Sequence, residues 1–156
     1  MSTPCHCVQL RKAARKIGAQ YDAALAPIGI NIAQFSLLRA VERGQPVSLT
    51  ELGRTLDLDR STMGRNVRVV EKLGLVRLDR GEDQREAVVS LNEHGVAVLR
   101  LAEPLWERCQ RQVADQLGPT RLQLLGGLRQ LFCKFSQTRV YNPYGCGHAH
   151  PNLDRQ

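Results

Sequence analysis

The side chains most able to bind another molecule lie in residues 58–76, LDRSTMGRNVRVVEKLGLV, where basic and hydroxyl-bearing residues recur at helical spacing. On a helix these residues share one side, and the apolar residues share another. The first set is Ser61, Arg65, Arg68 and Lys72, and the second is Met63, Val67 and Val70. This division predicts a helix that packs through one face and meets a polyanion with the other, although an ordinary solvated charged face has the same pattern.

A shorter helix is expected just before it, over about Thr50–Leu56, and the polar segment Asp57–Asp59 turns the chain between the two. Asp59 can cap the longer helix, which is expected to begin near Arg60 and to end by Leu73–Gly74. Two helices joined by a short polar turn form a helix-turn-helix, which places its second helix in the major groove of DNA.

Contacts with DNA are expected to divide along this second helix. Its candidate DNA-binding residues are Arg60, Ser61, Thr62, Arg65, Asn66 and Arg68. A helix in the major groove reads bases through its first turns, so Ser61, Thr62 and Arg65 are expected at base edges. Arg68 is expected to grip phosphate, and Asn66 can do either.

A strand, a polar turn and a second strand are expected over residues 75–91, with the turn at Arg80–Gln84. Arg80 and Arg85 flank the tip, where a guanidinium can enter a narrow minor groove. Asp83 can orient Arg85 through a charge-assisted bond. A plain surface hairpin with a charged tip is the alternative interpretation.

Together these segments resemble the multiple-antibiotic-resistance regulator (MarR) family of winged-helix transcription factors, over about Val8–Tyr141. The likeness is carried by residues 58–76, by Asp83-Gln84-Arg85 and by VVSLNEHG at 88–95. It implies a mainly α fold with a small β-wing, in which a winged helix-turn-helix is flanked by N- and C-terminal dimerisation helices.

The resemblance also implies that Ser61, Thr62 and Arg65 face the major groove, and that Arg85 enters the minor groove with support from Asp83. Two departures stand out. Many members carry a second wing arginine where this chain has Ala87, and Asn92 replaces the usual threonine at the next helix start. Asparagine is still a good helix cap.

Four further helices are expected before and after this DNA-binding segment. They cover residues 9–25, 32–43, 92–117 and about 120–141, with Gly118-Pro119 as a stop and with a kink or local break at Pro104. The last carries an apolar stripe of Leu122, Leu125, Leu128, Phe132 and Phe135. Nothing else in the chain obviously covers this stripe, which predicts a dimer.

The expected organisation is a dimerisation platform from residues 1–30 and 118–156, a DNA-binding domain at 31–91 and a linker helix at 92–117. In the family, the first and last helices of both subunits interlock. A two-fold symmetric dimer is expected to bind a pseudo-palindromic operator in double-stranded DNA. The function predicted is that of a homodimeric repressor released by a metal, redox or small-molecule signal.

The composition is consistent with a DNA-binding protein but adds little evidence for one. The formal net charge is +7, yet residues 54–85 hold eight basic and six acidic side chains, so placement matters more than total charge. No apolar run reaches about 18 residues and the N-terminus has no apolar core of a secretory signal, so a cytoplasmic protein is expected.

Cysteine and histidine gather at the two ends of the chain. Six of the nine lie in the clusters Cys5-His6-Cys7 and Cys146-Gly147-His148-Ala149-His150. Thiolates and imidazoles suit zinc, copper or an iron-sulfur cluster. The family's dimer brings the N-terminus of one subunit near the last helix of the other, which implies that the clusters can meet across the interface.

Two other interpretations of the ends stay open. Cys5 and Cys7 precede a helix, where its dipole and Arg11 or Lys12 favour a reactive thiolate and hence a redox sensor. Alternatively, the clusters belong to tails without a function. Cys109 and Cys133 lie in apolar helical patterns and are expected to be packed, inert thiols.

No catalytic motif or phosphate-binding loop occurs, so the chain is not expected to be an enzyme. A metal- or thiol-dependent enzyme and a winged-helix module that binds only protein are the alternatives. Many family members bind small aromatic acids in a crevice that Tyr21, Phe35 and Trp106 could line here. At helical spacing such side chains are more often part of a core.

Overall fold

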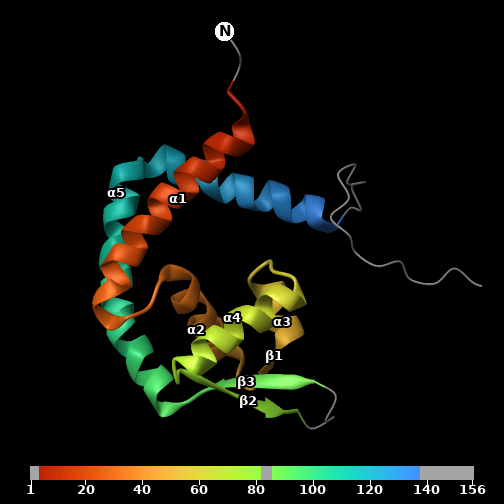
Figure 1. Cartoon of the computed structure of the whole chain (residues 1–156). Coiled ribbons are helices and arrows are strands. Elements are labelled where there is room, and N and C mark those ends of the chain that lie inside the picture. The colour runs from red at the N-terminus through yellow and green to blue at the C-terminus, as the bar shows by residue number, and fades with distance from the viewer. Residues whose placement is uncertain (1–3, 82–85, 138–156) are drawn as a thin grey trace, which may run out of the picture. The chain divides into compact units, whose positions relative to one another are not determined.

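The computed structural model describes residues 4–81 and 86–137. The chain divides into two units, Met1–Asp115 and Gln116–Gln156. The elements are α1 (His6–Leu25), the 3₁₀ turn η1 (Ala26–Ile28), α2 (Ile32–Gly44), β1 (Val47–Ser48), α3 (Leu49–Thr55), α4 (Arg60–Lys72), β2 (Val76–Arg80), β3 (Ala87–Leu91) and α5 (Glu93–Gln137). Helices predominate around one small antiparallel sheet (Figure 1), so the predicted mainly α fold with a small wing is confirmed.

Local sequence rules set the helix boundaries. Asn31 accepts from the backbone N–H of Gln34, and the Gln34 side chain accepts from the backbone N–H of Asn31, so α2 begins at a complete capping box. The same arrangement joins Ser48 and Glu51 at the start of α3. After α1, the chain turns through Gly29, whose φ of 75° is one that glycine adopts without strain.

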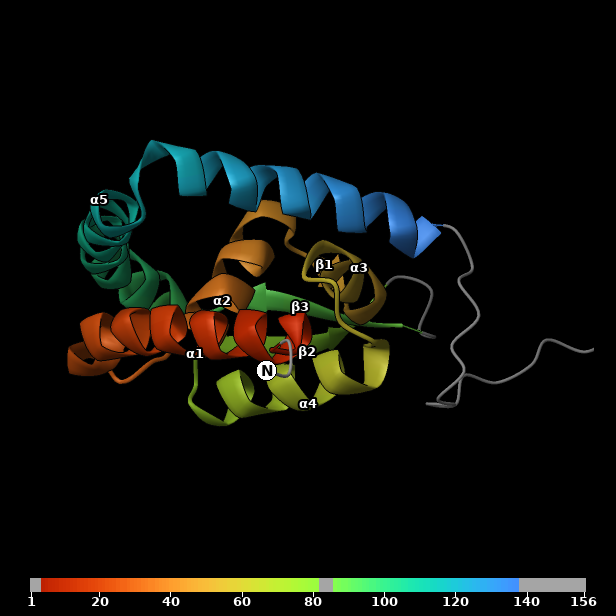
Figure 2. The same cartoon turned by 90° about the horizontal axis from the view of Figure 1, so that it is seen from above.

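A single apolar core joins the helices of the first unit to its sheet. Its fully buried side chains include Leu25, Leu38, Val41, Leu52, Met63, Val67, Val70 and Val89. Figures 1 and 2 show α2, α3 and α4 grouped over the sheet, where their apolar faces meet. This core fixes the orientation of α4, because rotating the helix would expose its buried stripe.

The sheet has the strand order β1-β3-β2. Val47 pairs with Val89 across β1 and β3, and Arg80 pairs with Ala87 at the far end of β2 and β3. Arg80 therefore belongs to a strand, and the expectation that it opens the wing turn is wrong. The antiparallel register that pairs Val76 with Leu91 continues without interruption to the pair Arg80 and Ala87, so β2 includes Arg80.

Asn92 caps the start of α5 and also links it to the residues that follow α4. The Asn92 side chain accepts from the backbone N–H of Gly95 and donates to the carbonyl of Gly74, at 2.8 and 2.7 Å. Of the kink or local break expected at Pro104, the break is not found: within α5 only Gly118, with φ 71° and ψ 167°, leaves helical dihedral angles. The expected stop at Gly118-Pro119 is confirmed as this kink.

Among the described residues, no single helix is long and apolar enough to cross a membrane. The pair His6–Ile28 and Ile32–Gly44, bent by 74°, passes that test together on length and composition alone.

Candidate nucleic-acid interface

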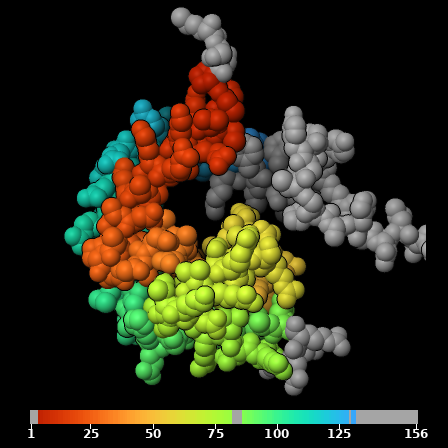
Figure 3. All heavy atoms as spheres, viewed as in Figure 1, coloured from red at the N-terminus to blue at the C-terminus, as the bar shows by residue number. Residues whose placement is uncertain are grey.

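Helix α4 has two chemically different faces. Its buried side chains are Met63, Val67 and Val70, each 0% exposed. The exposed stripe on the opposite side is Ser61, Arg65, Arg68 and Lys72. Figure 3 shows this helix, in yellow and light green, on the surface of the near face. Because the apolar stripe is buried, the basic stripe must lie at the surface.

The first turn of α4 is organised by Asp59. One carboxylate oxygen, Oδ1, accepts from the backbone N–H of Thr62 at 2.8 Å and from the hydroxyl of Ser61 at 2.6 Å. The other oxygen, Oδ2, accepts from the hydroxyl of Thr62 at 2.7 Å. The Ser61 hydroxyl, followed by the two Thr62 donors, holds the pKa of the Asp59 carboxyl well below its ordinary value. Asp59 is therefore the helix cap that the sequence predicted.

The bond network continues to Arg65, one turn further along the helix. Arg65 Nη2 donates to Thr62 Oγ1 at 3.1 Å. Sequence reasoning placed both residues near DNA but did not foresee this link, because a residue pattern does not specify side-chain rotamers. The link leaves the other guanidinium donors of Arg65 available to a ligand.

The remaining predicted contacts of α4 lie around this network. Arg60 and Arg68 are exposed, and Asn66 is half-buried. Within residues 4–81 and 86–137, none of these three side chains has a hydrogen-bond or ion-pair partner. Their polar groups are free to bind phosphates or base edges.

The turn between α3 and α4 depends on a close backbone approach at Gly53. The backbone N–H of Leu58 donates to the carbonyl of Gly53 at 2.8 Å, and a Cβ at Gly53 would lie 2.6 Å from the Leu58 carbonyl oxygen. Asp57 in the same turn has a φ of 52°. Sequence reasoning did not single out Gly53, although a glycine inside a short helix is a signal of close approach.

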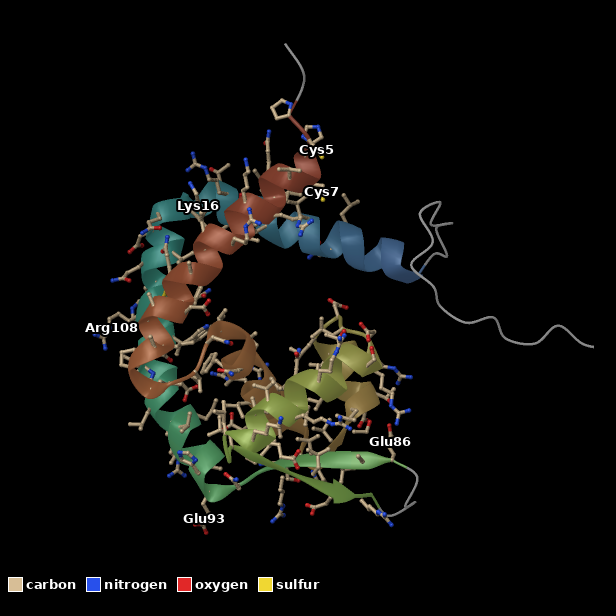
Figure 4. The ribbon with its side chains drawn as sticks, viewed as in Figure 1. Cys5, Cys7, Lys16, Glu86, Glu93 and Arg108 are labelled. Atoms are coloured by element: carbon tan, nitrogen blue, oxygen red, sulfur yellow. The ribbon has the colours of Figure 1, made fainter. Side chains whose placement is uncertain are left out.

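The wing, the β2–β3 hairpin with its connecting turn, is tied to α3 near the turn end of the hairpin. Thr50 Oγ1 donates to Glu86 Oε1 at 2.9 Å, and Figure 4 shows Glu86 beside the start of β3. Arg80, at the end of β2, is exposed. The other two predicted wing residues, Asp83 and Arg85, lie outside the described residues.

The N-terminal cysteine and histidine residues lie at the start of α1, the end of this helix that is remote from the wing. Cys5, His6 and Cys7 are exposed at the start of this helix, as Figure 4 shows for the two cysteines. Cys146, His148 and His150 lie outside the described residues. In the part of the chain that the structure describes, no three His, Cys, Asp or Glu side chains come together as a metal site.

The aromatic residues considered for a ligand crevice pack with their neighbours. Phe35 is buried and stacks on Trp106, with ring centroids 5.6 Å apart. Tyr21 is also buried, and its hydroxyl donates to the side chain of Gln110. Cys109 is 3% exposed, and burial raises the pKa of its thiol, as expected for a packed cysteine.

Comparisons with known proteins agree on one family. The MarR family model matches residues 28–86. The transcriptional regulator MosR of M. tuberculosis, solved in complex with DNA, is 32% identical over 86% of this chain and 100% of that chain, with a TM-score of 0.76. A second structure of MosR is 31% identical over 85% of this chain and 93% of that chain, with a TM-score of 0.67.

A more partial match is the HTH-type transcriptional regulator YwoH of Bacillus subtilis, 29% identical over 85 residues. The match covers 54% of this chain, and the chain spans 62% of the length of that regulator. These proteins are regulators and not enzymes, in agreement with the expectation from sequence. The chain belongs to the MarR family of winged-helix transcriptional regulators.

Proposed function

We propose that the chain is a homodimeric transcriptional repressor that binds a pseudo-palindromic operator through α4 and the wing. The observation that carries the proposal is the exposed stripe of α4, where Arg65 is held by Thr62 beside the free guanidinium of Arg68. An arginine early in such a helix can donate two bonds to the edge of a guanine. MosR, at 32% identity, was solved in complex with DNA.

The residues proposed to contact DNA are those expected from sequence. They are Arg60, Ser61, Thr62, Arg65, Asn66 and Arg68 of α4, together with Arg80, Asp83 and Arg85 of the wing. The hydroxyl hydrogens of Ser61 and Thr62 are already donated to Asp59. Toward DNA, these hydroxyls therefore act as acceptors unless their bonds to Asp59 break.

Exposed apolar side chains support the proposed dimer. In the first unit, Val8 and Leu10 of α1 are 49% and 50% exposed. In the second unit, Leu124, Leu125 and Leu131 are 62%, 47% and 50% exposed. Apolar faces of this kind favour association, because a second copy removes them from water. We assign residues 1–30 and 118–156 to the dimerisation platform, 31–91 to DNA binding and 92–117 to the linker helix.

The signal that releases DNA is proposed to act at the chain ends or through a small molecule. Cys5, His6 and Cys7 are exposed and so are accessible to a metal ion, an iron-sulfur cluster or an oxidant. Cys146, His148 and His150, which lie outside the described residues, are proposed from the sequence to supply further ligands or thiols. Elemental analysis and an absorption spectrum of anaerobically purified protein would distinguish these inputs. A Cys5→Ser, Cys7→Ser variant that retains the full metal content of wild type would remove the N-terminal cluster from the metal proposal.

A gel-shift titration on the DNA upstream of the gene tests the proposal. Wild type is expected to shift this DNA, with an affinity that falls steeply as salt rises, because phosphate contacts release counterions. Arg108, on α5 away from α4 in Figure 4, offers a control: Arg108→Ala loses the same charge as Arg65→Ala but is expected to bind normally. Absence of a salt-sensitive shift by wild type would favour a winged helix that binds only protein.

A further inference from the structure

The first turn of α4 holds a chain of hydrogen bonds that runs from Arg65 through Thr62 to Asp59. Arg65 Nη2 donates to Thr62 Oγ1 at 3.1 Å, and Thr62 Oγ1 donates to Asp59 Oδ2 at 2.7 Å. A hydroxyl has one hydrogen and two lone pairs. Because the hydrogen of Thr62 is committed to Asp59, a lone pair remains to accept from Arg65.

Asp59 sets the donor-to-acceptor direction of these hydrogen bonds. An ionised carboxylate can only accept, and this one also accepts from the backbone N–H of Thr62 at 2.8 Å and from the Ser61 hydroxyl at 2.6 Å. These bonds favour the ionised state of Asp59, whose pKa is lowered. The Thr62 hydroxyl is therefore held with its oxygen facing the residue one helical turn later, which is Arg65.

We propose that Asp59, acting through the Thr62 hydroxyl, is a positioning residue that orients the Arg65 guanidinium and thereby sets the base selectivity of α4. This inference rests on the proposed function in DNA binding. A long arginine side chain loses rotamer freedom when it docks on a base edge. Orienting it before binding lowers that cost only for the geometry in which its free donors face the intended base.

The neighbouring Ser61 provides a matched control. Its hydroxyl bonds to the same carboxylate, at 2.6 Å, but makes no bond to Arg65. Thr62→Val removes the hydroxyl that Arg65 uses while keeping the shape of the side chain, and Thr62→Ser restores the hydroxyl. Asp59→Asn keeps a capping oxygen but permits its amide to donate to the Thr62 hydroxyl, which reverses that one bond and no longer holds the hydroxyl hydrogen in place.

The first experiment uses the DNA-free protein and NMR relaxation of the Arg65 side-chain nitrogens. Wild type, Thr62→Ser and Ser61→Ala are expected to show a restricted Arg65 guanidinium. Thr62→Val and Asp59→Asn are expected to show faster and wider motion. Equal Arg65 motion in wild type and Thr62→Val would overturn the proposal.

The second experiment measures selectivity on a duplex that wild type selects from a randomised pool, and on its single-base variants. At the base pairs whose preference is relaxed by Arg65→Ala, Thr62→Val and Asp59→Asn are expected to reduce discrimination by about 2- to 10-fold, the cost range of one immobilised side chain. Thr62→Ser is expected to retain discrimination. The salt dependence of Thr62→Val should equal that of wild type, because no phosphate contact is lost.

A double-mutant cycle separates positioning from direct contact. If Thr62 acts through Arg65 in addition to its proposed DNA contact, then Thr62→Val reduces discrimination less in the Arg65→Ala background than in wild type. The same loss in both backgrounds would show that Thr62 reads DNA itself, and would overturn the positioning role. If wild type selects no sequence from the pool, the proposed function fails and this inference fails with it.

Discussion

Arg39 of α2 and Glu103 of α5 form an ion pair, with Nη1 and Oε1 2.8 Å apart. The guanidinium of Arg39 also lies 5.7 Å from the ring centroids of Phe35 and of Trp106. One side chain thus joins a core helix of the winged helix-turn-helix to the first part of α5. In the proposed dimer, this joint holds each DNA-binding domain on its linker helix.

Replacing Arg39 is expected to weaken this joint. Arg39→Ala should lower the free energy of unfolding by about 1–2 kcal/mol, because it removes an ion pair and two cation–π contacts from a partly buried side chain. Urea unfolding at fixed protein concentration measures the change. Arg77→Ala serves as the control, since its partner Asp79 and Arg77 itself are 55% and 68% exposed, and should cost less than about 0.5 kcal/mol. Equal losses in the two variants would contradict this role of Arg39.

Two glycines of the helix-turn-helix should respond in opposite directions to alanine. Gly53→Ala would place Cβ 2.6 Å from the Leu58 carbonyl oxygen, so it should destabilise the fold by about 1–3 kcal/mol. At Gly64, in α4, an added Cβ would meet no atom within 4 Å other than its chain neighbours and the backbone of its own helix. Gly64→Ala should stabilise by about 0.5–1 kcal/mol through higher helix propensity. Thermal unfolding compares the two, and a tolerated Gly53→Ala would show that the turn has room to move.

The elements that local rules specify were predictable from sequence. Asp59 caps α4, which starts at Arg60, because the short carboxylate side chain favours this position over the helix interior. The apolar stripe of α4 likewise predicted which face of the helix is buried. At Pro104 the sequence allowed a kink or a local break, and the break is absent, since α5 keeps helical dihedral angles there.

Features set by distant partners were not predictable. Strand β1 has two residues, Val47 and Ser48, and exists because they pair with Val89 and Val88 far along the chain. The wing tether from Thr50 to Glu86 joins residues 36 positions apart. The Arg65–Thr62 bond is local, between residues three positions apart, but it depends on rotamers that no spacing rule specifies. The fold was therefore more accessible from sequence than the geometry of its interface.

The stability that the Asp59 cap gives to the fold should fall at acid pH. Folding lowers the pKa of Asp59 below its ordinary value of 3.8, so the ionised carboxylate stabilises the fold above that value and its contribution is lost as pH falls further toward the folded-state pKa. The difference in urea midpoint between wild type and Asp59→Asn should therefore be full at about pH 7 and shrink below about pH 4. A difference that stays constant over this range would mean that the charge of Asp59 does not stabilise the cap.

The proposed dimer makes a prediction about the second unit. Leu125 is 47% exposed there, and Leu125→Asp should convert the dimer to monomer by placing a charge in the interface. Size-exclusion chromatography with light scattering measures the mass. Leu101 of α5, which is 61% exposed in the first unit, provides the control, because Leu101→Asp is expected to leave the dimer intact. A Leu125→Asp protein that remains dimeric would place the interface elsewhere.

Selective DNA recognition by α4 is tested most directly by titrating wild type, Arg65→Ala and Arg68→Ala against the selected duplex and its single-base variants, at several salt concentrations. Arg65→Ala should relax preference at particular base pairs by about 1–3 kcal/mol. Arg68→Ala should weaken all duplexes alike and reduce the slope of log affinity against log salt by about one. Arg108→Ala should behave as wild type. Identical behaviour of Arg65→Ala and Arg68→Ala would contradict the division of roles, and a wild type that binds every duplex equally would contradict sequence-specific recognition by α4.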